Sequence, residues 1–406
     1  MKTTLKVNLF KLHFNVIVVL LVVKLLFSYL LVRLSYFQRH LKGNSESYNF
    51  LGVPTELSNS IEYLLLPVLI LFVFFYRKWA KFSVRIILFL VIMAVLNIIT
   101  GLINDVSFLG SLTFTLKIFS PILLFCSLVI YHNKTDLDLK KLLIRFFKLC
   151  IFLTIIAIFQ FNPTFNRLTN YLPVYFDSIH THNYILVSIF IGVSYFIYRN
   201  NKSYQLILFF AISFAFLLIG YNVRTALIMY LIYIIAMLFL VSDLFKYLLV
   251  KLAIFVPLFI ILGFFVKSEV DLTEVSSGRT TMYADKVEQL STYNLKDWLF
   301  GRGYGSDLIY TDVWWWDKKG AHSDFITFVV ENGVIYLLIF IVLFMYLISL
   351  TKKINIIYTI TILSALFSGI ISNGVLVRPL ANYVLFMVLA YIYIDIKQRQ
   401  NLNYQH

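Results

Sequence analysis

Long apolar stretches recur along almost the whole chain, and they restrict it to one class of fold. A helix that crosses a bilayer core about 30 Å thick needs roughly 20 mainly apolar residues, and the sequence supplies about twelve such stretches. Hydrophobic residues make up 60% of the 406 residues, whereas soluble proteins typically have about 45 to 50%. We therefore predict an all-α polytopic membrane protein with about twelve transmembrane helices, forming a single integral membrane domain over residues 1–406.

The predicted spans leave one long polar segment, residues 267–323, which we expect to be a large extracytoplasmic loop between the ninth and tenth spans. The first span is not expected to be a cleavable signal, because its apolar run is long and carries Lys24 and Arg33. The predicted spans are 13–36, 61–76, 84–103, 114–131, 142–161, 183–199, 204–220, 225–241, 247–266, 324–350, 354–376 and 380–395.

The net charge of +15 follows the predicted topology and does not indicate a nucleic-acid-binding surface. If the N-terminus is inside, most basic residues of the short connecting segments fall on the cytoplasmic side, as the positive-inside rule requires. This topology puts both termini in the cytoplasm and residues 267–323 outside, and it makes nucleic acid an unexpected partner. The cytoplasmic basic residues include Lys2, Lys6, Lys11, Arg77, Lys78, Lys81, Lys140, Lys141, Lys352, Lys353, Lys397 and Arg399.

Residues 279–290 of the loop are predicted to form a short helix that lies on the membrane. Ser277 or Gly278 is a candidate cap for this helix. Arg279 then falls in the first turn, where free backbone amides favour anions. The apolar residues at helical spacing are Tyr283, Val287 and Leu290.

Two further features of the loop have structural explanations. The tryptophans of residues 314–316 are typical of interfacial anchoring, and stacking of Trp315 on a sugar is the alternative. The glycines of residues 301–305 superficially resemble a nucleotide-binding loop, but no strand precedes them. We expect them to allow a tight reversal of the chain.

Two arginines and one histidine are the strongest candidates for chemistry. Arg224 lies in a very short outer turn, and Arg279 belongs to the same face of the membrane. A guanidinium donates two parallel hydrogen bonds to phosphate oxygens, so the pair suits a lipid-linked diphosphate; snorkelling is the alternative for Arg224. His322 is the single histidine of the loop and is a candidate general base, since a free imidazole takes a proton at a pH of about 6.5. Asp324 is a candidate to orient it.

No metal ion and no cofactor are expected. Asp177, His180 and His182 are potential ligands on one segment, but without a fourth ligand they are a weak zinc signal.

The segments GYNVRTA, SSGRTTMYADKVEQL, DWLFGRGYG and AHSDFITFVVENGVIYLLIF, in this order, resemble the O-antigen polymerase and ligase superfamily. The resemblance is best over residues 220–345, and Ser323 departs from it, because the family commonly has Asn after the histidine. It implies a GT-C-like, metal-independent inverting glycosyltransferase of the bacterial cytoplasmic membrane, with an undecaprenyl-diphosphate-linked oligosaccharide as donor. By this resemblance Arg224 and Arg279 hold the diphosphate, and His322 activates the acceptor hydroxyl.

The resemblance leaves the acceptor open. A polymerase transfers the growing glycan to another lipid-linked repeat unit, and a ligase transfers it to lipid A core. We favour the polymerase, because a composition rich in Ile, Lys, Tyr, Phe and Asn is typical of AT-rich polysaccharide clusters. A lipid-linked oligosaccharide flippase is the alternative from another class. Membrane lipids and a chain-length regulator protein are the other expected partners, and the candidates for binding diphosphate or glycan are Arg302, Tyr304, Arg378 and Trp315.

Overall fold

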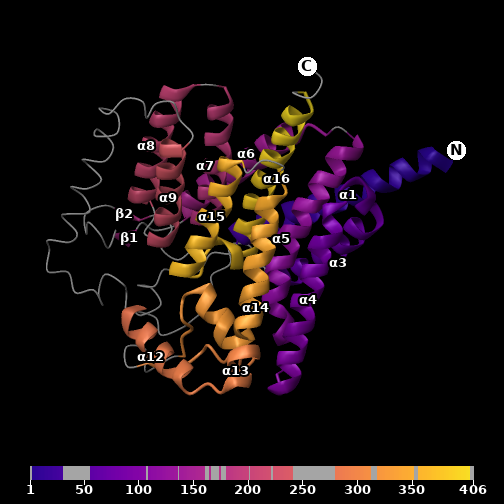
Figure 1. Cartoon of the computed structure of the whole chain (residues 1–406). Coiled ribbons are helices and arrows are strands. Elements are labelled where there is room, and N and C mark those ends of the chain that lie inside the picture. The colour runs from indigo at the N-terminus through magenta and orange to yellow at the C-terminus, as the bar shows by residue number, and fades with distance from the viewer. Residues whose placement is uncertain are drawn as a thin grey trace.

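The structure is a computed structural model, and almost all of what it describes is helical (Figure 1). It describes residues 2–30, 55–106, 108–135, 137–160, 164–165, 173–174, 180–200, 202–220, 223–240, 279–311, 318–351 and 355–402. The helices are α1 (Lys2–Leu30), α3 (Thr55–Tyr76), η1 (Arg77–Trp79), α4 (Phe82–Ile103), α5 (Phe108–Thr135), α6 (Leu139–Gln160), α7 (His180–Arg199), α8 (Ser203–Gly220), α9 (Arg224–Leu240), α12 (Arg279–Ser291), α13 (Leu295–Phe300), α14 (Asp324–Ser349), α15 (Ile356–Ile371), η3 (Val375–Val377) and α16 (Pro379–Leu402). Two short antiparallel strands, β1 (Thr164–Phe165) and β2 (Pro173–Val174), pair Thr164 with Val174.

The helical fold class of a membrane protein is confirmed. Every predicted span except 247–266 overlaps a helix, and that one lies outside the described residues. Among the described residues, six helices are long and apolar enough to cross a membrane. These six segments are Leu9–Phe27, Ser60–Trp79, Phe82–Ile103, Thr115–Thr135, Asp324–Ser349 and Leu380–Gln400, and the shorter apolar helices are Tyr204–Leu218, Arg224–Phe239 and Ile356–Ile371.

Helices α5 and α16 form the centre of the bundle. They pack against each other, and α16 also packs against α7. In each of these two spans 83% of the residues are buried inside the protein, compared with 28% in the span of α3 and 33% in that of α4. The outer helices expose their apolar residues instead, which is what lipid-facing surfaces require. Exposed residues of this kind include Leu12, Val19, Leu64, Phe75, Leu88 and Leu102.

Helix α14 is interrupted at Gly333, which has a φ of 80°. The glycine segment that follows α13 fills the interruption: Arg302 N donates to Val330 O (2.9 Å), and Gly303 N donates to Glu331 O (2.9 Å). The carbonyls released by the break therefore keep hydrogen-bond partners, as buried backbone groups must. The glycines predicted to allow a tight reversal, Gly301, Gly303 and Gly305, all have positive φ, a conformation that other residues rarely adopt.

The close approach of these two segments predicts a large effect of Gly301→Ala. Gly301 has a φ of 74°, and a Cβ atom there would overlap the backbone of Glu331. Gly305 has a φ of 86° with no atom within 4 Å of such a Cβ, so Gly305→Ala is a matched control that isolates the backbone strain. We expect the control to lose about 1 to 2 kcal/mol and Gly301→Ala to lose clearly more. Thermal unfolding in detergent measures both, and equal losses would contradict the docking of the segment.

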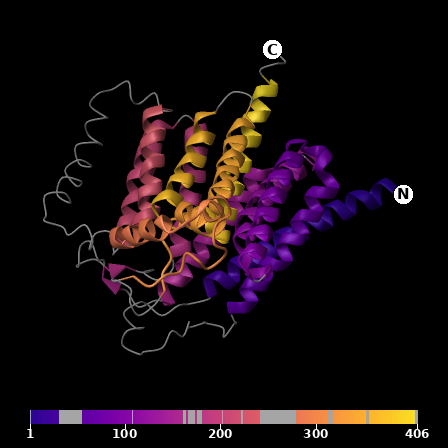
Figure 2. The same ribbon diagram turned by 60° about the horizontal axis from the view of Figure 1, so that its bottom comes forward.

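Helices α12 and α13 lie at one end of the bundle, which we call the loop end. In Figure 1 they form its bottom, whereas the C-terminal end of α16 points to the top and the N-terminus also lies in the upper half. Viewed with the bottom turned forward, α12 lies across the ends of the upright helices (Figure 2). The predicted helix at 279–290 is thus confirmed as α12, and its candidate caps lie outside the described residues.

Candidate functional site at the loop end

The course of α7, α8 and α9 places Arg224 at the loop end. Helices α7 and α16 run parallel, because the Arg378 guanidinium lies over the Tyr184 ring (5.2 Å to the centroid) where both begin, and Arg199 pairs with Asp395 (2.7 Å) where α7 ends. Helix α8 follows α7 after a short turn and packs against it. Helix α9 therefore starts at the same end as α16, with Arg224 as its first residue.

Helix α12 and the start of α14 both contact the end of α15. The Tyr283 hydroxyl donates to Ile371 O (2.9 Å), and the Ser323 hydroxyl donates to Ile370 O (2.8 Å). Ser323 is also the N-cap of α14, because its side chain accepts from Ile326 N. Its neighbour His322 and the first turns of α12 therefore lie around one helix end, and Arg279 is the first residue of α12.

The structure thus brings Arg224, Arg279, His322 and Arg378 to the loop end, from four different parts of the chain. This is the grouping that the predicted topology requires. Trp315, in contrast, lies outside the described residues.

The backbone of His322 has an unusual conformation that its neighbours hold in place. Its φ is 51°, in the left-handed region that residues other than glycine rarely adopt. On one side Ala321 N donates to Asp307 Oδ2 (2.9 Å), and on the other the Thr327 hydroxyl donates to the same oxygen (2.8 Å). Asp324, the residue expected to orient the histidine, is buried and accepts from Gly374 N (2.9 Å).

A buried ion pair joins this region to α12. Lys286 Nζ lies 2.9 Å from Asp307 Oδ1, and the two side chains are 1% and 5% exposed. The same ammonium also donates to Asp307 O and to Gln289 Oε1 (3.1 Å). Sequence analysis missed this pair, because a lysine on the polar face of an amphipathic helix is typical of a solvated surface and the pairing depends on tertiary contacts.

Two of the candidates for binding diphosphate or glycan, Arg302 and Tyr304, have structural surroundings that restrict their roles. Arg302 pairs with Asp297 (3.1 Å), donates to Thr292 O (2.9 Å) and lies over the Tyr293 ring (4.1 Å to the centroid). Its guanidinium is therefore held within the loop. Tyr304 is 45% exposed. Its partial burial raises the pKa of its phenol, and the nearby Glu331 carboxylate adds a smaller effect in the same direction. The phenol therefore keeps its proton and is available as a hydrogen-bond donor.

The helices also contain ionisable groups that sequence analysis did not single out. Lys24 pairs with Glu62 (2.7 Å), and the Tyr383 hydroxyl donates to the same carboxylate. Lys117 of α5 lies within electrostatic range of Glu331 and Asp324. Groups of opposite sign are thus placed together inside the bundle, which reduces the high cost of charge at that depth.

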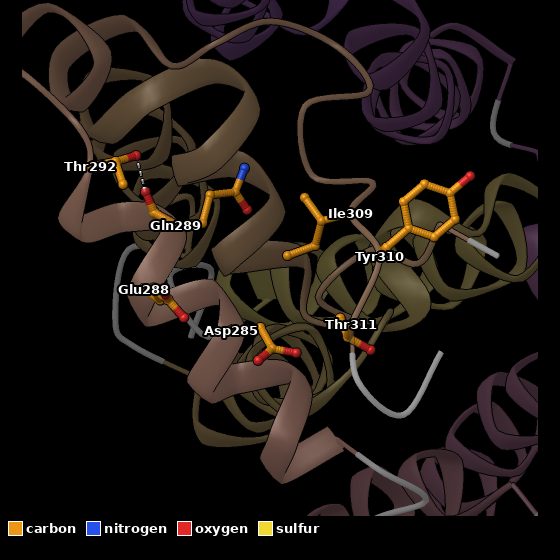
Figure 3. Close-up of a pocket in the computed structure, with 7 residues that line it drawn as sticks. All are labelled: Asp285, Glu288, Gln289, Thr292, Ile309, Tyr310 and Thr311. Atoms are coloured by element: carbon orange, nitrogen blue, oxygen red, sulfur yellow. Dashed lines mark hydrogen bonds between the residues drawn. The ribbon is translucent and has the colours of Figure 1, made fainter. Parts of the chain in front are cut away.

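A groove between α12 and residues 309–311 offers a different chemical environment (Figure 3). It has a volume of about 520 Å³, within the range of small-molecule sites. Among the residues that line it none is basic, and Asp285 faces the segment that contains Thr311. Carboxylates, hydroxyls and a tyrosine suit the hydroxyl groups of sugars and repel phosphate. The lining residues are Asp285, Glu288, Gln289, Thr292, Ile309, Tyr310 and Thr311.

Comparison with known proteins adds no relative: no model of a protein family matches this chain, and no curated protein matches it.

Proposed function

We propose that this chain is an O-antigen polymerase, or the polymerase of a related surface polysaccharide. It transfers a growing glycan from undecaprenyl diphosphate to a lipid-linked repeat unit, as a metal-independent inverting glycosyltransferase. The observation that carries the proposal is the grouping of Arg224, Arg279, Arg378 and His322 at the loop end of an apolar helix bundle. Cations and a titratable imidazole at that place match a lipid-linked diphosphate donor and a hydroxyl acceptor.

In the proposed reaction, the chain itself supplies every group that acts on the two substrates. His322 takes the proton of the acceptor hydroxyl while its oxygen forms a bond to the anomeric carbon of the donor. The bond from that carbon to the diphosphate oxygen breaks, and the diphosphate leaves with the electron pair. Arg224 and Arg279 stabilise its growing negative charge, which is the type of electrostatic stabilisation that contributes most to many enzymes. Attack opposite the leaving group inverts the anomeric centre.

The groove on α12 is the proposed place for sugars of the glycan that do not react. Asp285 lies six residues after Arg279, about 9 Å along a helix. The proposed sugar site, which excludes phosphate, thus lies beside the proposed phosphate site. In a diphosphate-linked glycan the sugars likewise follow directly after the diphosphate. A chain-length regulator protein is a further proposed partner.

We also propose the full topology of about twelve spans, in a GT-C-like arrangement with residues 267–323 as an outer loop and both termini in the cytoplasm of a bacterial cell. Helices α6, α7 and α15 support it, since they pack beside the longer apolar spans, and α8 and α9 in turn pack against α7.

The arginines provide the test of the donor site. We expect Arg279→Ala and Arg224→Ala each to reduce polymer formation about tenfold to hundredfold, because each removes hydrogen bonds to a charged leaving group worth about 1.5 to 3 kcal/mol. Arg279→Lys should recover only part of the activity, since an ammonium lacks the bidentate fork. Purified protein with extracted lipid-linked repeat units measures the rate.

The matched control is Arg145→Ala, which removes an arginine from α6 that belongs to none of the proposed sites. Normal rates for both Arg224→Ala and Arg279→Ala would contradict the donor site. The accumulated product of a null strain separates the two transferases: loss of a polymerase leaves single repeat units on the lipid core, whereas loss of a ligase leaves long chains on undecaprenyl diphosphate. Full polymer in the null strain would contradict both.

A further inference from the structure

We infer that Asp307 is the positioning residue of His322, and that the Lys286–Asp307 pair couples this position to α12. The inference rests on the proposed role of His322 as a base. The sequence offers no reason to pair these two residues, because a lysine on the polar face of an amphipathic helix is typical of a solvated surface.

The first step of the argument is the placement of one carboxylate on both sides of the histidine. Asp307 Oδ2 accepts from Ala321 N, directly before His322, and from the Thr327 hydroxyl in the first turn of α14. Charge-assisted hydrogen bonds of this kind are short and strong. The two contacts fix the chain where it passes from an extended segment into the helix.

The second step is the conformation that this fixation maintains. A left-handed φ of 51° at a histidine costs free energy and persists where surrounding contacts determine it. Gly320, two residues before His322, leaves room for the Asp307 carboxylate, since a Cβ atom there would lie 2.6 Å from Asp307 Oδ2. The carboxylate can approach the backbone closely only because residue 320 has no side chain.

The third step is the connection to the proposed donor site. Lys286 lies seven residues after Arg279 on the same helix, about two turns away. Its ammonium holds Asp307 by the carboxylate and by the backbone carbonyl. Asp307 thus links the helix that begins with Arg279 to the segment that carries His322.

The decisive experiment compares Asp307→Ala with Asp395→Ala in the full chain, using extracted lipid-linked repeat units as the probe. Asp395 is a matched control, because like Asp307 it pairs with a basic side chain (Arg199, 2.7 Å) and accepts from a hydroxyl (Tyr195), but at the other end of the bundle. We expect Asp307→Ala to lower kcat about hundredfold, since a displacement of about 1 Å can cost that much. The KM for the donor should change less than about threefold, and the control should keep its kcat.

A second pair of variants keeps the test valid if Asp307→Ala folds poorly. Thr327→Val removes one of the two contacts and should lower kcat several-fold without a change in KM. The double variant Lys286→Met/Asp307→Asn removes both charges but keeps an oxygen for Ala321 N and Thr327, so it should recover to within about tenfold of the wild-type kcat. A purely structural role would reduce the amount of folded enzyme and leave the kcat of the folded fraction unchanged.

The outcomes separate this inference from the proposed function. If His322→Ala is inactive while folded Asp307→Ala and Thr327→Val keep full kcat, the base stands and the positioning role is wrong. If His322→Ala itself polymerises normally, His322 is not the base and the positioning inference is wrong with it. In this experiment the proposed function is contradicted only if the wild-type protein makes no polymer. A drop of kcat in the two positioning variants at constant donor KM, with recovery in the double variant, supports the inference.

Discussion

Replacing His322 with asparagine should lower the rate of polymerisation about hundredfold to ten-thousandfold, which is the contribution of a well-placed general base. Asparagine is the informative substitution, because it accepts a left-handed φ more readily than most residues and the native φ is 51°. The backbone at the start of α14 is then retained while the proton acceptor is lost. The measurement is the rate with purified protein and lipid-linked repeat units, together with the polymer ladder of a complemented deletion strain.

The same variant needs a control for folding. His322→Asn should unfold at a temperature close to that of the wild type, because the contacts of Asp307 and Ser323 use neighbouring residues. His132→Asn provides the comparison for loss of a histidine, since His132 lies in α5 near the opposite end and contacts Gln398. Normal polymer length in His322→Asn would remove the histidine from the mechanism.

The second large effect is expected at the ion pair between α1 and α3. Lys24→Met leaves the Glu62 carboxylate without its cation at a position where the two side chains are 10% and 12% exposed. Removal of one partner of a buried pair typically costs about 3 to 5 kcal/mol, because the remaining charge is poorly solvated. We expect this loss in the free energy of unfolding, measured by denaturation in detergent.

Two further variants make this prediction specific. Lys24→Met/Glu62→Gln should recover most of the stability, since no charge remains and the amide oxygen still accepts from the Tyr383 hydroxyl. Lys141→Met breaks an exposed pair with Asp138, in which the lysine side chain is 77% exposed and the aspartate side chain 49%. It should change the free energy of unfolding by less than about 1 kcal/mol. Equal effects of Lys24→Met and Lys141→Met would show that the buried pair is not a stability determinant.

The helices were predictable because their signal is local. The span predicted at 84–103 corresponds to α4, Phe82–Ile103, and the span predicted at 324–350 corresponds to α14, Asp324–Ser349. The interruption of α14 at Gly333 was not predicted, since Glu331, Asn332 and Gly333 are too few polar residues to end an apolar stretch of this length. Its cause is a tertiary contact, because the segment after α13 supplies the amides that satisfy the freed carbonyls.

The candidate site shows the same division. Topology alone placed Arg224, Arg279 and His322 on one face, and the structure brings these residues to one end of the bundle. Asp307 could not be found in this way, because its proposed role depends on hydrogen bonds that it accepts from Ala321 N and the Thr327 hydroxyl, which are distant in the sequence.

The sequence by itself determined that this chain is a helical membrane protein. It also determined which ends of the apolar helices carry cations and a histidine. Lipid dictates this, since it demands long apolar helices and tolerates charge mainly at their ends. The tertiary structure decided which buried charges meet, that α14 is interrupted and that Lys286 of α12 is joined to the neighbours of His322. Such pairings depend on the packing of distant segments, and a hydrophobic pattern carries no information about them.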